Sequence, residues 1–204
     1  MNKAVMISIQ PKWCELIASG KKTIEVRKTK PKIDTPFKCY IYCSQNQFMA
    51  RKTNGDFWFA KRNSLIQPID SIQFSGKVIG EFICDYIDET YPIRINHIKY
   101  MYLGDWVKNK ANTKNTCLSL KELSDYGKGK PLYGLHISQL KIYDKPKELS
   151  EFRKQNVCYK QGSLEELGCW ESGCTMQDLG ECDGKCSRLT RPFQSWGYVE
   201  EFEE

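Results

Sequence analysis

The stretch Gly20-Lys21-Lys22-Thr23-Ile24-Glu25-Val26-Arg27 decides how the rest of the chain is interpreted. From Lys22 to Arg27, polar and apolar residues alternate, which is typical of a half-buried β-strand. Side chains of a strand point alternately to its two faces, so every second residue shares a face. The pattern therefore predicts one polar face, made of Thr23, Glu25 and Arg27, opposite an apolar one, made of Ile24 and Val26.

The polar face has two interpretations. A core strand rarely carries a carboxylate and a guanidinium two residues apart unless that face meets water or a cleft. In a cleft, Glu25 would accept hydrogen bonds and Arg27 would offer a planar fork of donors, which suits a nucleobase edge or a phosphate. Alternatively, the face is solvated and carries a cross-strand ion pair. Spacing alone favours the solvated face.

The segment that precedes this strand predicts a strand, a short helix and a tight turn. Val5–Ile9 is a short apolar strand, and Pro11 suits a first helical position. Three apolar residues then recur at the spacing of one helical face: Trp13, Leu16 and Ile17. Gly20 is typical of the position just past a helix end. The turn should bring Lys21 and Lys22 to the mouth between helix and strand.

The opening of the chain resembles the ASCH family, which is related to the PUA RNA-binding fold. The family pattern G-x-K-x-x-E-x-R is met in register by Gly20, Lys22, Glu25 and Arg27. The resemblance continues in three further segments: Gly76–Phe82, Tyr133–Leu149 and Leu189–Glu200. It implies an α+β fold, a PUA-like β-barrel with flanking helices. We expect residues 1–150 to form this domain, and residues 151–204 to form a cysteine-rich C-terminal extension that packs back on the barrel.

Composition indicates a cytoplasmic protein with an anionic partner. The chain has 204 residues and a net charge of +6. Residues 1–80 carry 14 Lys and Arg against 5 Asp and Glu, a balance of +9, and the remainder has a balance of −3. A basic half favours a polyanion, although lysine-rich surface is also common in ordinary proteins. No apolar run approaches the roughly 18 residues of a membrane span, and no signal-peptide pattern is present.

The last quarter of the chain contains a candidate metal site. In a reducing compartment, the ten cysteines are expected as thiols or metal ligands rather than disulfides. Four of them follow the pattern C-x4-C-x7-C-x3-C: Cys169, Cys174, Cys182 and Cys186. The outer spacings suit a structural zinc ion, with Cys158 as a substitute ligand, although the inner spacing is short. An iron–sulfur cluster or plain thiols are the alternatives.

Other segments give local predictions. Asn54-Gly55 predicts a hairpin whose basic and aromatic arms either follow a nucleic-acid strand or pack on the barrel. Ser119 and Glu122 form a capping box, so a helix should run to about Gly127 with one buried face, made of Leu120, Leu123 and Tyr126. Residues 88–116 are expected to be irregular. Cys39 and Cys43 are expected to be buried. Glu81 and Asp85 share one face of a predicted strand, and parity leaves open whether that face or the opposite one meets the cleft. A lone histidine such as His136 is a core residue more often than a base.

Two functions follow from the resemblance. The first is a binding module for RNA or single-stranded nucleic acid, which would use Lys21, Lys22, Glu25 and Arg27. The second is a hydrolase, because proteins similar to this family deacylate N4-acetylcytidine and other relatives cut RNA. In that case Lys22 and Glu25 would be the catalytic residues. The deacetylase pattern has a threonine at the position that corresponds to Glu25, so the chain departs from that pattern.

Overall fold

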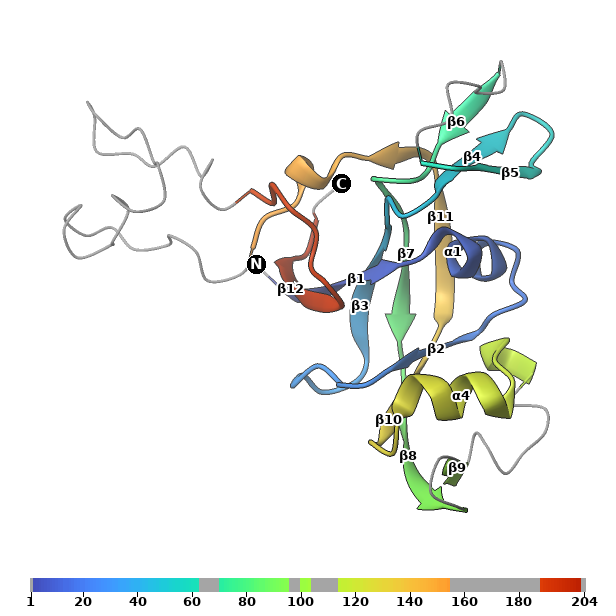
Figure 1. The fold of residues 1–204 in the computed structure, drawn as a ribbon. Helices are drawn as coiled ribbons and strands as arrows, with labels where there is room; N and C mark the ends of the chain where they lie inside the picture. The colour runs from blue at the N-terminus through green and yellow to red at the C-terminus, as the bar shows by residue number, and fades with distance from the viewer. Residues whose placement is uncertain (1, 63–69, 96–99, 104–113, 155–187, 203–204) are drawn as a thin grey trace, which may run out of the picture.

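The computed structural model describes residues 2–62, 70–95, 100–103, 114–154 and 188–202. Within these residues the strands form a five-stranded, a four-stranded and a three-stranded sheet (Figure 1). The five-stranded sheet has the order β11 (Ser138–Lys147), β7 (Val78–Cys84), β3 (Phe37–Cys43), β1 (Lys3–Ile9) and β12 (Trp196–Glu200). The four-stranded sheet has the order β2 (Ile24–Arg27), β10 (Leu132–His136), β8 (Ile87–Arg94) and β9 (Tyr100–Leu103). The three-stranded sheet has the order β5 (Phe57–Ala60), β4 (Phe48–Lys52) and β6 (Ser71–Gln73).

The chain passes twice between the two larger sheets with almost no break in strand structure. β7 runs into β8 after Asp85 and Tyr86, and β10 runs into β11 after Ile137. The pairing follows the chain through this bend, with Leu135 opposite Ile87 before it and Ser138 opposite Ile83 after it. The strands therefore curl from one sheet into the other, and the result is a mostly-β α+β fold with a half-barrel sheet. This confirms the α+β expectation in its coarser form.

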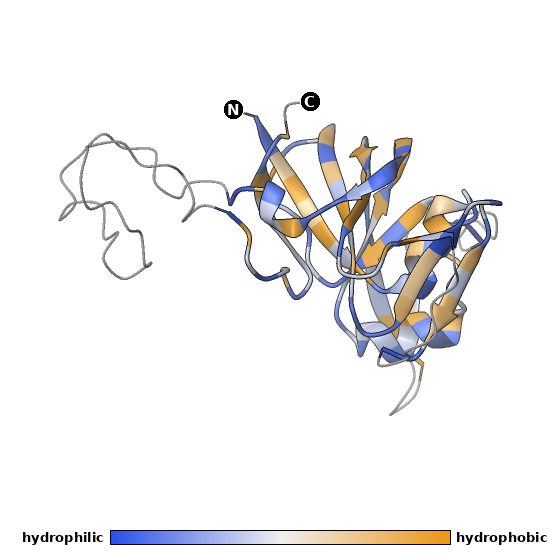
Figure 2. Ribbon diagram, turned by 90° about the horizontal axis from the view of Figure 1, so that it is seen from above, coloured by the Kyte–Doolittle hydropathy of each residue, from blue (hydrophilic) through white to orange (hydrophobic). Residues whose placement is uncertain are grey.

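The central strands are apolar on both faces, as Figure 2 shows by their orange runs. Odd-numbered residues of β1 and β3, such as Val5, Ile7, Cys39 and Cys43, lie in the largest buried cluster. The burial expected for Cys39 and Cys43 is confirmed. Even-numbered residues of the same strands belong to a second cluster on the opposite face: Ala4, Met6, Tyr40 and Tyr42. Such double burial explains why these strands are nearly continuous hydrophobic runs.

Residues from the C-terminal part cover the second face. Phe152 lies just after a short 3-10 helix, η1 (Leu149–Glu151), and stacks edge-on against Tyr40 at a centroid distance of 4.9 Å. Leu189 is also fully buried there, and β12 adds Val199 opposite Ala4. The predicted cysteines, Cys158, Cys169, Cys174, Cys182 and Cys186, lie outside the described residues, so the zinc site remains a prediction. Within the described residues, no group of His, Cys, Asp and Glu is placed to hold a metal ion.

Two helices flank the strands, as expected. α1 (Pro11–Ala18) begins at the predicted proline and buries Cys14 and Ile17. α4 (Leu120–Gly127) begins with the predicted capping box, in which both the Ser119 and the Glu122 hydrogen bonds are present. In the described part of the chain, no helix combines the length and the apolar character needed to cross a membrane.

Two local predictions are wrong. Residues 88–116 are not irregular throughout, because β8 and β9 form an antiparallel hairpin. Its inward residues include Thr90 and Tyr102, which are buried, and tertiary contacts of this kind are invisible in a short polar sequence. Leu120 is 58% exposed rather than buried. It is the first helical residue of α4, and a side chain there lies over the turn before the helix instead of facing Leu123 and the core.

The predicted hairpin at Asn54-Gly55 is confirmed. β4 and β5 pair antiparallel around a turn in which Gly55 has φ +90°, a left-handed conformation that favours glycine. Phe57 and Phe59 on one arm pack against the main buried cluster. The packing interpretation therefore holds for these two rings.

Candidate functional site

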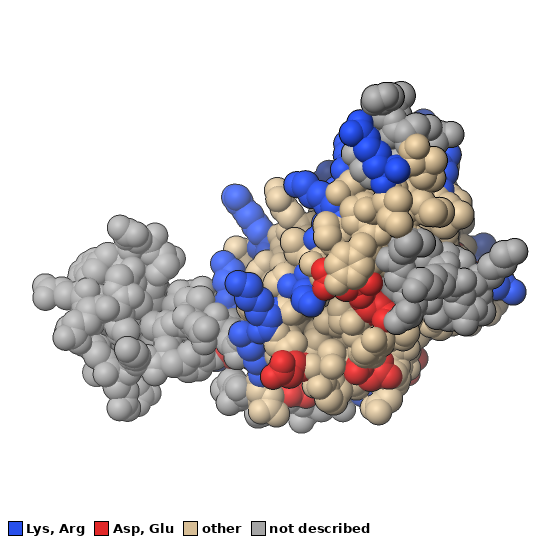
Figure 3. All heavy atoms as spheres, turned by 90° about the horizontal axis from the view of Figure 1, so that it is seen from below, with Lys and Arg blue, Asp and Glu red and all other residues tan. Residues whose placement is uncertain are grey.

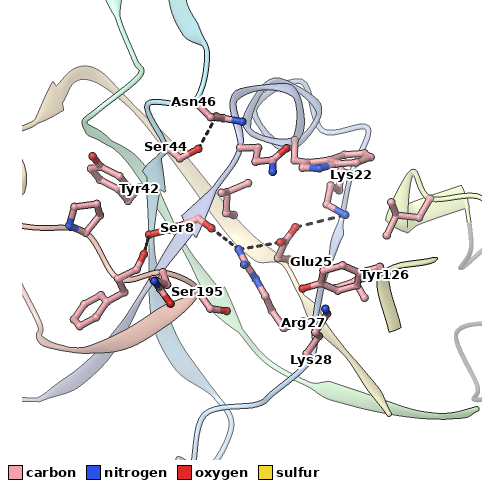
Figure 4. Close-up of a pocket in the computed structure, with 18 of the residues that line it drawn as sticks. Ser8, Lys22, Glu25, Arg27, Lys28, Tyr42, Ser44, Asn46, Tyr126 and Ser195 are labelled. Carbon is pink, nitrogen blue, oxygen red and sulfur yellow. Dashed lines mark hydrogen bonds and ion pairs between the residues drawn. The ribbon is translucent and has the colours of Figure 1, made fainter. Parts of the chain in front are cut away.

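A cleft of about 1000 Å³ opens between the two larger sheets, beside α1 and α4 (Figure 4). Its walls come from the end of β1, the start of α1, β2 and the loop after it, the end of β3, one side of α4, and residues 192–195. Figure 4 shows Lys22, Glu25 and Arg27 pointing toward one another along one wall. Three of the four residues of the sequence pattern thus meet at this cleft.

The three charged side chains form one connected set. Glu25 Oε2 lies 3.5 Å from Lys22 Nζ, and Glu25 Oε1 lies 3.1 Å from Arg27 Nη2. Lys22 Nζ also donates a 2.7 Å hydrogen bond to the carbonyl of Thr116. Arg27 Nη2 donates a 2.7 Å hydrogen bond to the carbonyl of Ser8. Each cation is therefore shared between the central carboxylate and one backbone carbonyl, which fixes the positions of all three side chains.

Burial makes this set unlike a surface ion pair. Lys22 is 2% exposed, Glu25 is 6% exposed and Arg27 is 8% exposed. The interpretation of this strand face as solvated is therefore wrong. The reason is tertiary, because β1 and the segment around Thr116 bring carbonyl oxygens over the face. Charges removed from water need such partners, since an unpaired buried charge costs several kcal/mol.

The turn after α1 and the packing of β2 position the three charged side chains. The turn after α1 uses Gly20 with φ +72°, and the Lys22 amide bonds back to the Leu16 carbonyl at 2.9 Å. β2 then pairs with β10 alone among the described strands, with Glu25 opposite Leu135. Its apolar residues, Ile24 and Val26, pack in a third buried cluster with Leu123 and Leu132. That packing turns the charged side chains of β2 toward the cleft.

Burial disfavours the charged form of Lys22. Burial lowers the pKa of Lys22, and the Glu25 carboxylate opposes the shift. The Trp13 ring, whose centroid lies 5.3 Å from Lys22 Nζ, adds a cation–π contact. Since Lys22 is almost wholly enclosed and already donates to Thr116 and Glu25, it is better placed to position the carboxylate than to contact a phosphate.

Arg27 retains unused hydrogen-bonding capacity. Its Nε is buried and has no hydrogen-bond partner among the described residues. A buried donor without a partner costs roughly 1–3 kcal/mol, so such a group usually has a structural or functional explanation.

Aromatic and polar side chains complete the walls, and the sequence analysis did not assign them to the site. Trp13 and Tyr126 flank the charged set, while Ser44 and Asn46 lie across the cleft, joined by a 2.9 Å hydrogen bond. The Ser8 hydroxyl donates to the Phe193 carbonyl, which ties residues 192–195 to β1. The available signals were the apolar faces predicted for α1 and α4, which contain Trp13 and Tyr126.

The remaining predicted residues lie elsewhere or at the margin. Lys21 is exposed and does not line the cleft. Neither Glu81 nor Asp85 lines it, and Glu81 instead accepts a 2.7 Å hydrogen bond from the Tyr143 hydroxyl. Outside the cleft, His136 Nε2 lies 3.0 Å from a carboxylate oxygen of the buried Asp88, so His136 has a partner as a structural histidine would.

The cleft is close to neutral despite the basic sequence around it. Its basic residues are Lys22, Arg27, Lys28 and Arg62, and its acidic residues are Glu25, Glu122 and Asp125. Four positive and three negative charges leave a balance of +1. Net charge alone therefore gives the cleft no strong attraction for a polyanion.

Comparison with known proteins supports the resemblance found in the sequence. The sequence model of the ASCH domain matches residues 7–46. The chain is also similar to the crystal structure of ASCH from Zymomonas mobilis, with a TM-score of 0.44 and 18% identity over 72% of this chain and 73% of that chain. Two mutant forms of the Zymomonas mobilis protein give TM-scores of 0.44 and 19% identity, over 72% of this chain and 77% and 74% of theirs. No match was found among curated proteins.

Proposed function

Residues 7–46 match the sequence model of the ASCH domain, and from this premise we propose that the cleft of this chain binds a nucleotide or an unpaired base of RNA. The observation that supports the proposal most directly is the buried set of Lys22, Glu25 and Arg27 on one cleft wall. A carboxylate acceptor beside a guanidinium donor is the arrangement that recognises the hydrogen-bonding edge of a base.

Each member of the set has a distinct role in this proposal. Glu25 accepts N–H groups of the base, since its oxygens keep lone pairs beyond the two ion pairs. Arg27 donates to a ring nitrogen or a carbonyl oxygen of the base. Lys22 holds Glu25 in place through its bond to the Thr116 carbonyl.

The wall residues supply what base recognition needs besides polar groups. Single-stranded bases are commonly held by stacking on aromatic side chains. Trp13 and Tyr126 are partly exposed and line the cleft, and the Trp13 ring lies beside Lys22. Phosphate contacts fall to Lys28 and Arg62, which line the cleft and are exposed, unlike Lys22.

Equilibrium binding to a random single-stranded RNA pool tests the proposal. We expect binding at low salt that weakens as salt rises. The Arg27→Lys variant keeps the positive charge but loses the planar fork, so it should bind about 5- to 150-fold more weakly, the equivalent of roughly 1–3 kcal/mol for a bidentate contact. Exposed Lys145, which does not line the cleft, gives a control in Lys145→Gln. Absence of wild-type binding at low salt would refute the proposal.

A second candidate, a hydrolase acting on N4-acetylcytidine or on RNA, rests on one observation. The pKa of Lys22 is lowered by burial, and a lysine with a lowered pKa can serve as a base, with Glu25 as its proton-transfer partner. We expect no turnover, because the Lys22 ammonium is held as a donor by two oxygen acceptors. Incubation with N4-acetylcytidine and with RNA separates the two functions. Turnover by the wild type that is abolished in Lys22→Ala would establish the hydrolase.

A further inference from the structure

We propose that the cleft is one end of an extended surface that binds a single-stranded polynucleotide, and that the rest of the surface is a lysine strip formed by Lys28, Lys30 and Lys32 together with Trp196 of β12. The inference rests on the proposed function and specifies its ligand. A free nucleotide would fill the cleft alone, whereas a strand would also lie along the strip.

The strip is continuous with the cleft. Lys28 and Thr29 line the cleft, and the chain then passes directly over the surface through Lys30 and Lys32. Lys28 Nζ lies 4.7 Å from the ring centroid of Tyr126, which is itself a wall of the cleft. A strand that places one base between the cleft walls therefore meets Lys28 as it leaves.

The strip is held in place by β12. Trp196 Nε1 donates to Thr29 Oγ1 at 3.0 Å and to the Thr29 carbonyl at 3.2 Å. The Lys32 amide donates to the Tyr198 hydroxyl at 2.7 Å. These bonds come from the backbone and hydroxyl groups of the loop, so they leave the lysine ammonium groups available. A fixed row of cations loses less entropy on binding than a mobile loop would.

Charge along the strip is largely uncompensated. Lys28, Lys30 and Lys32 are exposed, and in the described residues only Lys30 has an ion pair, at 3.5 Å from Glu89. That pair is partly solvated, with 49% of the Lys30 side chain exposed, so it is weak and easily exchanged. The loop after β2 lies on the lower side of the molecule in Figure 1. Figure 3, which views the molecule from below, shows Lys and Arg atoms along the left side and at the top of this face, with separate groups of acidic atoms between and below them.

The division of charge between cleft and strip favours a polynucleotide over an acidic protein. The cleft has a balance of only +1 and presents a carboxylate, which disfavours a run of Asp or Glu side chains. The strip, in contrast, offers cations with a partly exposed indole beside them. A single-stranded polynucleotide suits both the cleft and the strip, because cations bind its phosphates and aromatic rings stack on its bases.

The experiment compares a short and a long ligand on the same variants. We would measure binding of ribonucleoside monophosphates and of a random-sequence RNA dodecamer by calorimetry and fluorescence anisotropy. The test variant is Lys30→Gln with Lys32→Gln, which leaves every cleft residue unchanged. The control is Lys141→Gln with Lys145→Gln, which removes the same charge from exposed positions of β11.

We expect the test variant to bind mononucleotides as the wild type does and to bind the dodecamer more weakly. The slope of log K against log salt for the dodecamer should become shallower by about 1.4, since each phosphate contact contributes roughly 0.7 for a single strand. The control should retain the wild-type slope. An unchanged slope in the test variant would overturn the strip while leaving the proposed function intact. Equal competition by polyglutamate would overturn it in favour of an acidic protein partner. If the wild type bound neither the mononucleotides nor the dodecamer, both proposals would be overturned.

Discussion

Replacing Glu25 with glutamine should destabilise the protein in a way that depends on pH. The Glu25 carboxylate lies between two buried cations, 3.5 Å from Lys22 Nζ and 3.1 Å from Arg27 Nη2. Glutamine keeps the volume and one acceptor oxygen but removes the negative charge. Two buried cations then have only neutral acceptors, namely the glutamine oxygen and the carbonyls of Thr116 and Ser8.

The expected loss in the free energy of unfolding is about 3–5 kcal/mol near neutral pH, the range measured when one partner of a buried ion pair is removed. A surface ion pair gives less than about 1 kcal/mol. The pair between Lys30 and Glu89 is of the surface kind, because 49% and 30% of the two side chains are exposed. Glu89→Gln is therefore the matched control, and we expect it to be nearly neutral.

The pH dependence follows from Lys22. Its pKa in the folded protein is already below the ordinary 10.5, and loss of the Glu25 charge should lower it further. A lysine with a depressed folded pKa makes folding costly below that pKa, and the cost disappears as the pH rises toward the unfolded pKa. In the variant this folding cost begins to fall at a lower pH than in the wild type, because the folded pKa of Lys22 is lower. Its deficit should therefore shrink as pH rises, by up to about 1.4 kcal/mol per pH unit between the two folded pKa values.

Urea unfolding of wild type, Glu25→Gln and Glu89→Gln at several pH values from neutral to alkaline measures this deficit. Taking the difference between variant and wild type removes the contribution of tyrosines and thiols that titrate in both proteins. A Glu25→Gln deficit below about 1 kcal/mol that does not change with pH is the behaviour of a solvated pair. That outcome would refute the buried three-residue arrangement.

Two further predictions concern other parts of the chain. Gly127→Ala should destabilise by about 1–3 kcal/mol in thermal unfolding despite alanine's better helix propensity, because the added Cβ would clash with the hydroxyl of buried Tyr102. The control Lys121→Ala, on the exposed side of the same helix, should be close to neutral in the same assay. Elemental analysis of protein purified without chelator should find one zinc ion per chain, bound by Cys169, Cys174, Cys182 and Cys186. The sequence around these cysteines has few apolar residues, and a structural zinc contributes about 10 kcal/mol or more in zinc-finger peptides. A negligible metal content with all ten thiols titrating after unfolding would contradict this prediction.

Alternation in the sequence was sufficient to place Glu25 and Arg27 on one face, but it could not decide what that face meets. The deciding groups are the carbonyls of Ser8 and Thr116, which lie 19 residues from Arg27 and 94 residues from Lys22 in the chain. Backbone carbonyls carry no signature in a sequence, because every residue has one. Only the three-dimensional fold shows that the face with Glu25 and Arg27 is buried.

The cleft walls illustrate the same limit. Trp13 and Tyr126 were predicted as helix-face residues, and the structure places both helices so that these rings border the cleft. Periodicity predicts which residues share a face of one helix, but not which other element that face meets. The error at Leu120 has a related origin, since the position sits at the helix start and the core lies on the other side.

Lys22 distinguishes a binding site from a catalytic one in physical terms. A lysine base needs a free lone pair within reach of the substrate proton. Here the ammonium donates to the Thr116 carbonyl at 2.7 Å, faces Glu25 at 3.5 Å and is 2% exposed. A carbonyl and a carboxylate both favour the protonated form, and they oppose the lowering of the pKa that burial causes. Catalysis by Lys22 would thus require the substrate to displace the Thr116 carbonyl.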